Sequence, residues 1–208
     1  MFVRGALMRN TLLFVAVSVL ASAGFAGAAT IYSEDFESNV LSTNATPTGW
    51  TLDSGSVDII GTGYFQWYGT GHYIDMNGST GVAGSISTTV TGLTAGQTYS
   101  LSFDVGYNNN SGNNEQLSFA IGDLSGTYGA PILSGSGTFL TLTYSFTATA
   151  ANQLLSFADT GNTPGDNGGA ILDNILITTA AVPLPAAGLL LLGGLGGLGA
   201  LRRRKSAK

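Results

Sequence analysis

Apolar side chains recur at every second position in several short segments of the chain. Residues 99–105 are the clearest case, because four apolar side chains alternate there with serine and aspartate. The same period returns in residues 117–121, 140–146 and 155–157, and a last apolar segment occupies residues 170–177. A period of two is what a strand with one buried face produces, whereas a helix needs a period of 3.6. We therefore predict a set of antiparallel strands.

Turn-forming residues separate these segments. Glycine, asparagine, serine and aspartate are concentrated in residues 91–96, 108–114, 122–129 and 161–169, and such residues favour turns. Leucine, lysine and glutamate are scarce between the two ends of the chain, which disfavours helix. Eight or more strands without a helical period predict an all-β fold, a β-sandwich of the jelly-roll type. Residues 30–181 have the length of one such domain.

The N-terminal segment has the pattern of a secretory signal peptide. Arg4 and Arg9 precede an apolar stretch at residues 11–20, and small residues follow it up to Ala26-Gly27-Ala28. A basic start, an apolar core and a small-residue cleavage site direct export and are then removed. We predict such a helix in residues 1–29. The alternative is a retained anchor, but the apolar core is shorter than the roughly 20 residues that a spanning helix needs.

The C-terminal segment, residues 182–208, has three parts. An extended motif is followed by an apolar stretch at residues 187–201 and a basic end. The motif consists of Val182, Pro183, Leu184, Pro185 and Ala186, and the basic stop consists of Arg202, Arg203, Arg204 and Lys205. The prolines fix φ and disfavour helix, which keeps the motif extended. Residues 186–201 would form a helix of about 24 Å, short for a hydrocarbon core of about 30 Å, so we predict a weak transmembrane helix.

These three parts, in this order, resemble the PEP-CTERM sorting signal in its VPLPA-CTERM variant, which is found in Gram-negative bacteria. The resemblance implies recognition by an exosortase, a membrane cysteine protease-transpeptidase. It also implies transient tethering to the inner membrane and then transfer to the cell surface or release. Leu184 stands between the prolines where the better-known form has glutamate, which leaves the exosortase subtype open. The alternative is an ordinary tail anchor with a proline hinge.

Basic and acidic side chains are separated along the chain. Two of the seven Lys and Arg residues lie in the first ten positions and the other five in the last seven, whereas all twelve Asp and Glu residues lie within residues 34–173. Basic residues beside short membrane segments stay on the cytoplasmic side, so the acidic body is the exported part. A body without Lys or Arg cannot neutralise phosphates, which argues against nucleic acid as a partner. The chain has no cysteine, which excludes disulfides and thiolate chemistry.

Few residues suggest catalysis. His72 is the only histidine, and neither a Gly-x-Ser-x-Gly elbow nor a Cys–His pair occurs. We therefore predict that the protein is not an enzyme. A pair of carboxylates for glycoside hydrolysis remains open as the alternative, although no spacing in the sequence singles out such a pair.

The densest aromatic cluster is formed by residues 64–68 with Tyr73 nearby. Flat rings stack on the apolar faces of sugars, and a few polar groups beside them bind hydroxyls. The predicted ligand-binding residues are Gln66, Trp67, Tyr68 and Tyr73. Successive residues of a strand face opposite sides, so the alternative is that most of these rings pack in the core.

Three segments of the body resemble galactose-binding-like jelly-roll domains, a group that includes many carbohydrate-binding modules. They are residues 34–37 with Gly49-Trp50 after them, residues 96–104 and residues 170–175. The resemblance implies a structural Ca²⁺ where the first and last strands meet, with Asp35 or Glu37 and Asp173 at the matching positions.

Oxygen ligands of the kind that calcium takes are also concentrated in residues 159–167. Their spacing does not match an EF-hand loop. The alternative is that Asp and Asn serve there only as turn formers.

Taken together, these features predict an exported protein of the cell surface or extracellular matrix that binds exopolysaccharide without catalysis. Two alternatives from other classes remain: a secreted glycan-active enzyme, and a structural coat protein without a small ligand.

The distribution of basic residues makes one direct prediction. Residues 30–181 contain no Lys or Arg, so trypsin has no cleavage site there even after heat unfolding. A protease that cuts after aromatic residues should degrade the same material, which serves as the control. The fragments are read by mass spectrometry, and a tryptic cut inside this range would contradict the expectation.

Overall fold

The computed structural model describes residues 27–66, 68, 70–107, 116–129, 138–161, 167–180 and 195. Within these ranges, Gly27–Pro183 is a compact unit of its own. The predicted signal peptide, the Val182–Ala186 motif and the basic stop lie outside the described residues, as does the predicted C-terminal helix except for Leu195. In the described part of the chain, no helix has the length and apolarity needed to cross a membrane.

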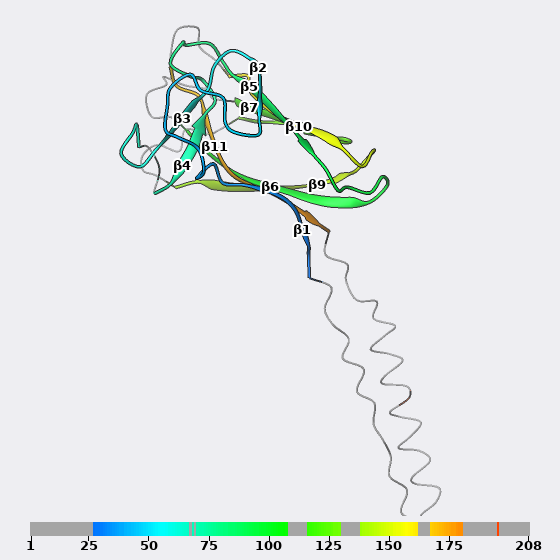
Figure 1. The fold of residues 1–208 in the computed structure, drawn as a ribbon. Coiled ribbons are helices and arrows are strands. Elements are labelled where there is room, and N and C mark those ends of the chain that lie inside the picture. The colour runs from blue at the N-terminus through cyan, green and yellow to red at the C-terminus, as the bar shows by residue number, and fades with distance from the viewer. Residues whose placement is uncertain are drawn as a thin grey trace, which may run out of the picture. The chain divides into compact units, whose positions relative to one another are not determined.

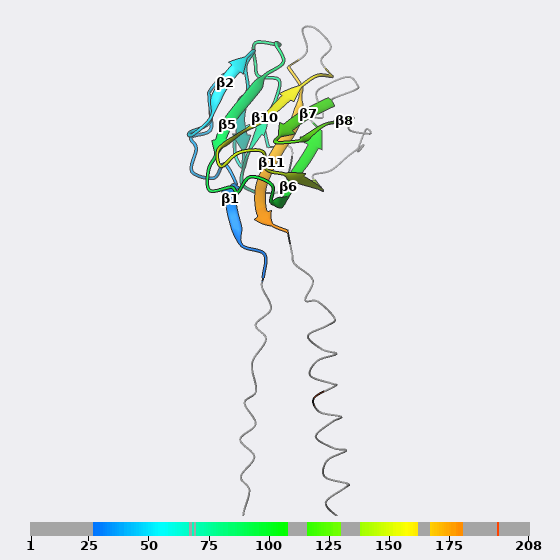
Figure 2. The same ribbon diagram turned by 90° about the vertical axis from the view of Figure 1, so that its right-hand side faces the viewer.

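Eleven strands in the described residues form two antiparallel sheets, which lie face to face (Figures 1 and 2). The six-stranded sheet has the order β3 (Asp58–Gly61), β4 (His72–Asp75), β11 (Ala170–Thr179), β6 (Thr98–Tyr107) and β9 (Leu140–Thr147), with β1 (Thr30–Glu34) also paired to β11. The five-stranded sheet has the order β2 (Thr51–Ser54), β5 (Ser85–Val90), β10 (Gln153–Asp159), β7 (Gln116–Ile121) and β8 (Leu124–Gly129). The predicted all-β sandwich is confirmed.

The main core lies between the sheets and is built from the alternating residues. Leu101 and Phe103 of β6 are fully buried, and Phe119 of β7 is only 3 % exposed. The Phe103 ring lies 5.1 Å from that of Phe119 and 5.0 Å from that of Phe157, both edge-on. Such aromatic pairs stabilise a core beyond the roughly 25 cal/mol per Å² of buried apolar area. The period of two therefore marks the strand faces that hold the sandwich together.

Strand β11 departs from the expected half-buried pattern, because its first four residues are all buried. Leu172 belongs to the main core, whereas Ile171 belongs to a second, smaller cluster. That cluster also contains Ile60, Tyr68 and Tyr73. Ile59 and Ile74, the neighbours of Ile60 and Tyr73 in their strands, lie in the main core, so the second cluster covers the outer face of the six-stranded sheet. We refer to residues 62–71, which bring Tyr68 onto this face, as the aromatic loop.

Strand β8 corrects the expectation of a turn over residues 122–129. Only Gly122 and Asp123 connect β7 to β8, and Gly122 has a φ of 60°, which glycine tolerates at the first position of a two-residue hairpin turn. The other small residues of this stretch belong to a strand. Gly126 pairs with Phe119, and a Cβ at Gly126 would lie 2.6 Å from Cζ of the ring. The glycine makes room for the ring instead of making a turn.

Candidate functional site

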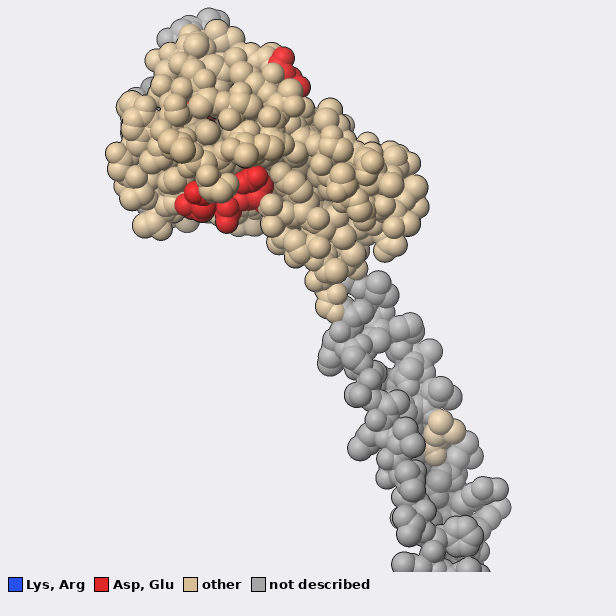
Figure 3. All heavy atoms as spheres, in the orientation of Figure 1, with Lys and Arg blue, Asp and Glu red and all other residues tan. Residues whose placement is uncertain are grey.

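Four carboxylates meet where the first strand, the last strand and β6 lie side by side. Glu34 at the end of β1 pairs with Ile175, and Asp173 of β11 pairs with Asp104 of β6. Asp35 and Glu37 follow β1 directly, and their charges, with that of Asp104, act on Asp173. We call Asp35, Glu37, Asp104 and Asp173 the acidic cluster. Acidic side chains gather in a patch on the surface in Figure 3, where the described surface shows no basic side chain.

A bulge in β11 shapes this cluster. The pairing between β11 and β6 shifts between Asp173 and Leu176, and Asn174 adopts the left-handed conformation with a φ of 47°, which Asn tolerates better than most residues. Its Nδ2 donates to Oδ2 of Asp104 at 2.9 Å and to Oδ2 of Asp173 at 3.2 Å. Its backbone N–H donates to Oδ1 of Asp173 at 2.7 Å. A neutral amide thus stands between two carboxylates, which lowers their mutual repulsion.

Glu37 connects the acidic cluster to the base of the aromatic loop. Its Oε1 accepts a hydrogen bond of 2.9 Å from the backbone N–H of His72, at the start of β4. A Cβ at Gly71 would lie 2.2 Å from the same Oε1, and Gly71 has a φ of 113°, so this position requires glycine. The side chain of Glu37 is therefore engaged by the backbone where the loop rejoins the sheet.

The donor types of the cluster suit a hard cation, since calcium takes carboxylate and amide oxygens. Among the described residues, however, no three acidic or histidine side chains stand in an arrangement that would hold a metal ion. Glu37 and Asp173 are already hydrogen-bonded to backbone N–H groups. The sequence-based choice of Asp35, Glu37 and Asp173 thus names residues that the fold brings together, and their metal binding stays a prediction. Asp104 escaped the sequence analysis because only the strand register places it opposite Asp173.

Burial and charge change the acidity of Asp173. The pKa of its carboxyl is raised from 3.8 to about 7, chiefly because burial disfavours the charged form. The charges of Asp104, Glu37 and Asp35 raise the pKa further, while the hydrogen bond from the backbone of Asn174 opposes the shift. The carboxyl of Asp173 therefore titrates near neutral pH.

The aromatic loop divides its residues between the interior and the surface. Tyr68 and Tyr73 are 5 % and 1 % exposed, and the Tyr68 ring stacks on Phe139 with centroids 4.6 Å apart. A Cβ at Gly106 would lie 2.5 Å from Cζ of Tyr68, so the ring rests on bare backbone of β6. These two predicted ligand-binding residues pack inside the protein, as the alternative proposed for most of the rings. Gln66 is exposed.

Trp67, the fourth predicted ligand-binding residue, lies outside the described residues. The ring that the sequence analysis did not choose is Phe65, which is 55 % exposed. It lies edge-on to Tyr64 with centroids 4.9 Å apart, and it has a φ of 50°. A bulky residue rarely adopts this conformation. Alternation along residues 64–68 gave no usable signal, because Gln66, which shares the parity of the buried Tyr68, is also exposed, and the left-handed φ at Phe65 interrupts the period of two.

Tyr64 is held by a pair of backbone hydrogen bonds to Gly61, each 2.9 Å long. Since Gly61 ends β3, the exposed ring of Phe65 is carried by a turn that is fixed to the sheet. The backbone strain at Phe65 is thus maintained by the structure around it, a situation that is concentrated at functional sites.

The raised pKa of Asp173 predicts how stability depends on pH. The folded chain binds this proton more tightly than the unfolded chain, so the stabilisation is complete below about pH 3.8 and is lost as the pH rises through about 7. We expect the melting temperature of the wild-type protein to fall between about pH 5.5 and about pH 8.5, and Asp173→Asn to remove most of that fall.

Asp53→Asn is the matched control, because it removes one exposed carboxylate from β2 of the other sheet. The measurements are made in a His72→Gln background, which removes the single histidine of the chain from every protein compared. A wild-type slope that survives in Asp173→Asn would show that another group titrates.

Relatives of the chain are found at the levels of family, sequence and fold. Residues 19–178 match the family described as "Protein of unknown function (DUF642)". Over 171 residues the chain is 30 % identical to Halomucin of Haloquadratum walsbyi, a stretch that covers 82 % of this chain and 2 % of that protein. The chain thus spans about one-fiftieth of the length of this curated relative.

Solved structures share the fold at low sequence identity. The tandem CBM22-1–CBM22-2 domain of Xyn10C from Paenibacillus barcinonensis has a TM-score of 0.50 and 18 % identity, over 80 % of this chain and 50 % of that one. A CBM35 from the same organism has a TM-score of 0.43 and 18 % identity, over 72 % of this chain and 99 % of that one. The CBM22-1–GH10 modules of Xyn10B from Clostridium thermocellum have a TM-score of 0.47 and 13 % identity, over 74 % of this chain and 29 % of that one.

The tandem domain supports the two-sheet sandwich as the fold. Because the family match extends over most of its length, the chain belongs to the DUF642 family of proteins of unknown function.

Proposed function

We propose that this protein is exported to the cell surface or the extracellular matrix and binds polysaccharide there without catalysis. The observation that carries the proposal is the exposed ring of Phe65, which lies edge-on to Tyr64, a residue packed against the second hydrophobic cluster. A rigid, exposed ring offers an apolar face to the C–H groups of a sugar, and it loses little conformational freedom on binding. The likeness of the sandwich to carbohydrate-binding modules supports the same class of ligand.

The neighbours of the ring fit this chemistry. The exposed side chain of Gln66 carries both a hydrogen-bond donor and an acceptor, which suits sugar hydroxyls. Residues 30–181 contain all twelve acidic residues and no Lys or Arg, so the body repels polyanions. The ligand that fits best is therefore a neutral polysaccharide.

Phe65→Ala tests this site directly. We expect the variant to bind the preferred neutral polysaccharide on the order of tenfold more weakly, a loss of about 1.4 kcal/mol, because the stacking surface is gone. Affinity electrophoresis in gels that contain soluble xylan, galactan or dextran measures the retardation. Phe65→Tyr should keep the binding.

Val82→Ala is the matched control, since it truncates another exposed apolar side chain, 53 % exposed, outside the loop. Equal retardation of Phe65→Ala and wild type would refute the role of the ring. Release of reducing sugars from any of the polysaccharides would contradict a non-catalytic function.

We also propose that Ca²⁺ binds to the acidic cluster and ties the first strand to the last. Asn174 would have to turn its amide so that the oxygen, and not the nitrogen that now donates to Asp104, faces the ion.

Calcium at 100 times its dissociation constant should stabilise the protein by roughly 2.7 kcal/mol, seen as a higher melting temperature. Asp173→Asn should lose most of this response, whereas Asp53→Asn should keep it. Equal responses of the two variants would indicate diffuse screening in place of a site.

The route to the surface is the third part of the proposal. An exosortase would recognise Pro183-Leu184-Pro185 outside the bilayer, while residues 187–201 and the basic stop hold the tail in the inner membrane. We expect the mature protein in its native host to end near Ala186. Replacing Pro183 and Pro185 with alanine would let a helix extend through the motif, so the unprocessed form should accumulate in the inner membrane. Mass spectrometry of the surface protein decides this, since a terminus at Lys208 would contradict it.

A further inference from the structure

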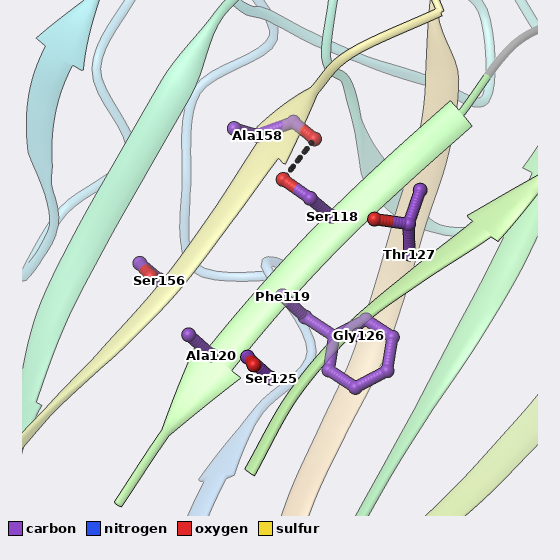
Figure 4. A pocket seen from close by; sticks show the side chains of 8 residues that line it. All are labelled: Ser118, Phe119, Ala120, Ser125, Gly126, Thr127, Ser156 and Ala158. Atoms are coloured by element: carbon purple, nitrogen blue, oxygen red, sulfur yellow. Dashed lines mark hydrogen bonds between the residues drawn. The ribbon is translucent and has the colours of Figure 1, made fainter.

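The outer face of the five-stranded sheet carries a hollow of about 370 Å³ (Figure 4). This volume lies in the range of ligand pockets, about 300–1,000 Å³. Its walls come from the neighbouring strands β10, β7 and β8, so they are fixed by continuous ladders of backbone hydrogen bonds. The lining residues are Ser118, Phe119, Ala120, Ser125, Gly126, Thr127, Ser156 and Ala158.

The register of the three strands explains why the surface is hollow. Two rows of outward-facing side chains cross the sheet, and each row mixes alanine with hydroxyl groups. The first row is Ser156, Ala120 and Ser125, and the second row is Ala158, Ser118 and Thr127. Rows on one face of a sheet lie two residues apart, about 6.6–6.8 Å. Small side chains at the centre of both rows leave a depression with hydroxyls around it.

The floor between the rows is apolar. Phe119 points into the main core but packs against the Cα of its partner Gly126, where a Cβ would lie 2.6 Å from the end of the ring. The apolar surface of the hollow therefore comes from the methyl groups of Ala120 and Ala158, because the ring of Phe119 lies on the inward side of the sheet. An apolar floor with a few polar groups around it is the usual composition of a small-molecule or sugar site.

Charge determines which ligand fits. None of the eight lining residues is ionisable, so the hollow offers no counter-charge to an anion or a cation. The hydroxyls of Ser125, Thr127 and Ser156 each supply one donor and two acceptor lone pairs, while the hydroxyl of Ser118 donates to the carbonyl oxygen of Ala158 at 3.2 Å. Anionic polymers are repelled by an acidic body without basic residues. Neutral polysaccharide, rich in hydroxyls and in C–H faces, is the ligand that matches both the rim and the floor.

The hollow and the aromatic loop lie on opposite faces of the sandwich. The loop packs on the outer face of the six-stranded sheet through Tyr68, whereas Ser118 and Ala120 face outward from the other sheet, since Leu117, Phe119 and Ile121 between and beside them lie in the main core. Two packed sheets about 10 Å apart separate the two surfaces. A polysaccharide segment seated at one surface therefore leaves the other open to a second chain.

We propose that the hollow is a second binding site for neutral polysaccharide, so that one domain engages two chains and cross-links them. The proposal rests on the polysaccharide binding proposed above for the aromatic loop, and it adds a function to it: the joining of chains in a matrix. Cross-linking by a single domain requires two independent binding sites. Because the rigid sandwich joins the two sites, the avidity of the protein for a network of chains exceeds the affinity of either site alone.

The experiment compares retention with cross-linking. The exported protein is run in affinity gels with the neutral polysaccharide that retards it, and the same polysaccharide in solution is followed by light scattering as protein is added. Ala120→Gln fills the centre of the hollow from an outward-facing position. Thr89→Gln is the matched control, because Thr89 is an exposed residue of β5 on the same sheet, outside the hollow. Melting temperatures verify that each variant is folded.

We expect the wild type and Thr89→Gln to be retarded and to increase scattering by large polysaccharide aggregates. Ala120→Gln and Phe65→Ala should each still be retarded, through the remaining site, but should lose most of the scattering increase. A wild-type protein that is retarded without cross-linking would overturn the second site, and so would cross-linking by folded Ala120→Gln equal to that of Thr89→Gln. A wild-type protein that no gel retards would instead overturn the polysaccharide binding on which the inference rests.

Discussion

Burial of strand β11 on both of its faces is the constraint on which the rest of the structure depends. Leu172 and Ile171 are both fully buried, one in each hydrophobic cluster. The strand pairs with β1, β4 and β6, so it fixes the position of the first strand and of the acidic cluster. It also provides the apolar surface on which the aromatic loop rests. A large-to-small change at Ile171 or Leu172 would disturb both layers, because cavities in a packed core are costly.

A second principle follows from the absence of Lys and Arg in residues 30–181. Carboxylates in this body are compensated by N–H and O–H donors. Asp58 shows this best, since its carboxylate accepts from the backbone of Asn44 at 2.7 Å and from the backbone and hydroxyl of Ser79 at 3.0 and 2.7 Å. Asp123 accepts from the backbone of Thr147 at 2.6 Å. Such bonds stabilise a charge while they tie neighbouring segments together.

The sequence predicts those features of the fold that depend on apolar residues recurring every second position within one strand. Alternation located β6 and β7 and their buried faces, because each pattern is contained within one strand. The same reasoning missed β8, where Gly126 leaves room for the ring of Phe119 on the neighbouring strand. It also missed Asp104, which joins the acidic cluster only through the register with Asp173. In the aromatic loop the sequence located the cluster, but packing over Gly106 decided that Tyr68 lies inside and left Phe65 at the surface. These outcomes depend on contacts between distant segments, which local patterns do not contain.

The lack of lysine in residues 30–181 has a chemical consequence for the polysaccharide binding proposed above. Reducing sugar ends are aldehydes in equilibrium, and lysine amines condense with carbonyl compounds to form Schiff bases. Residues 30–181 contain no lysine, so no side-chain amine of the body can enter that reaction. In the proposed setting among polysaccharides, this composition keeps the side chains of residues 30–181 free of Schiff bases with reducing ends, and the contacts with sugars stay reversible.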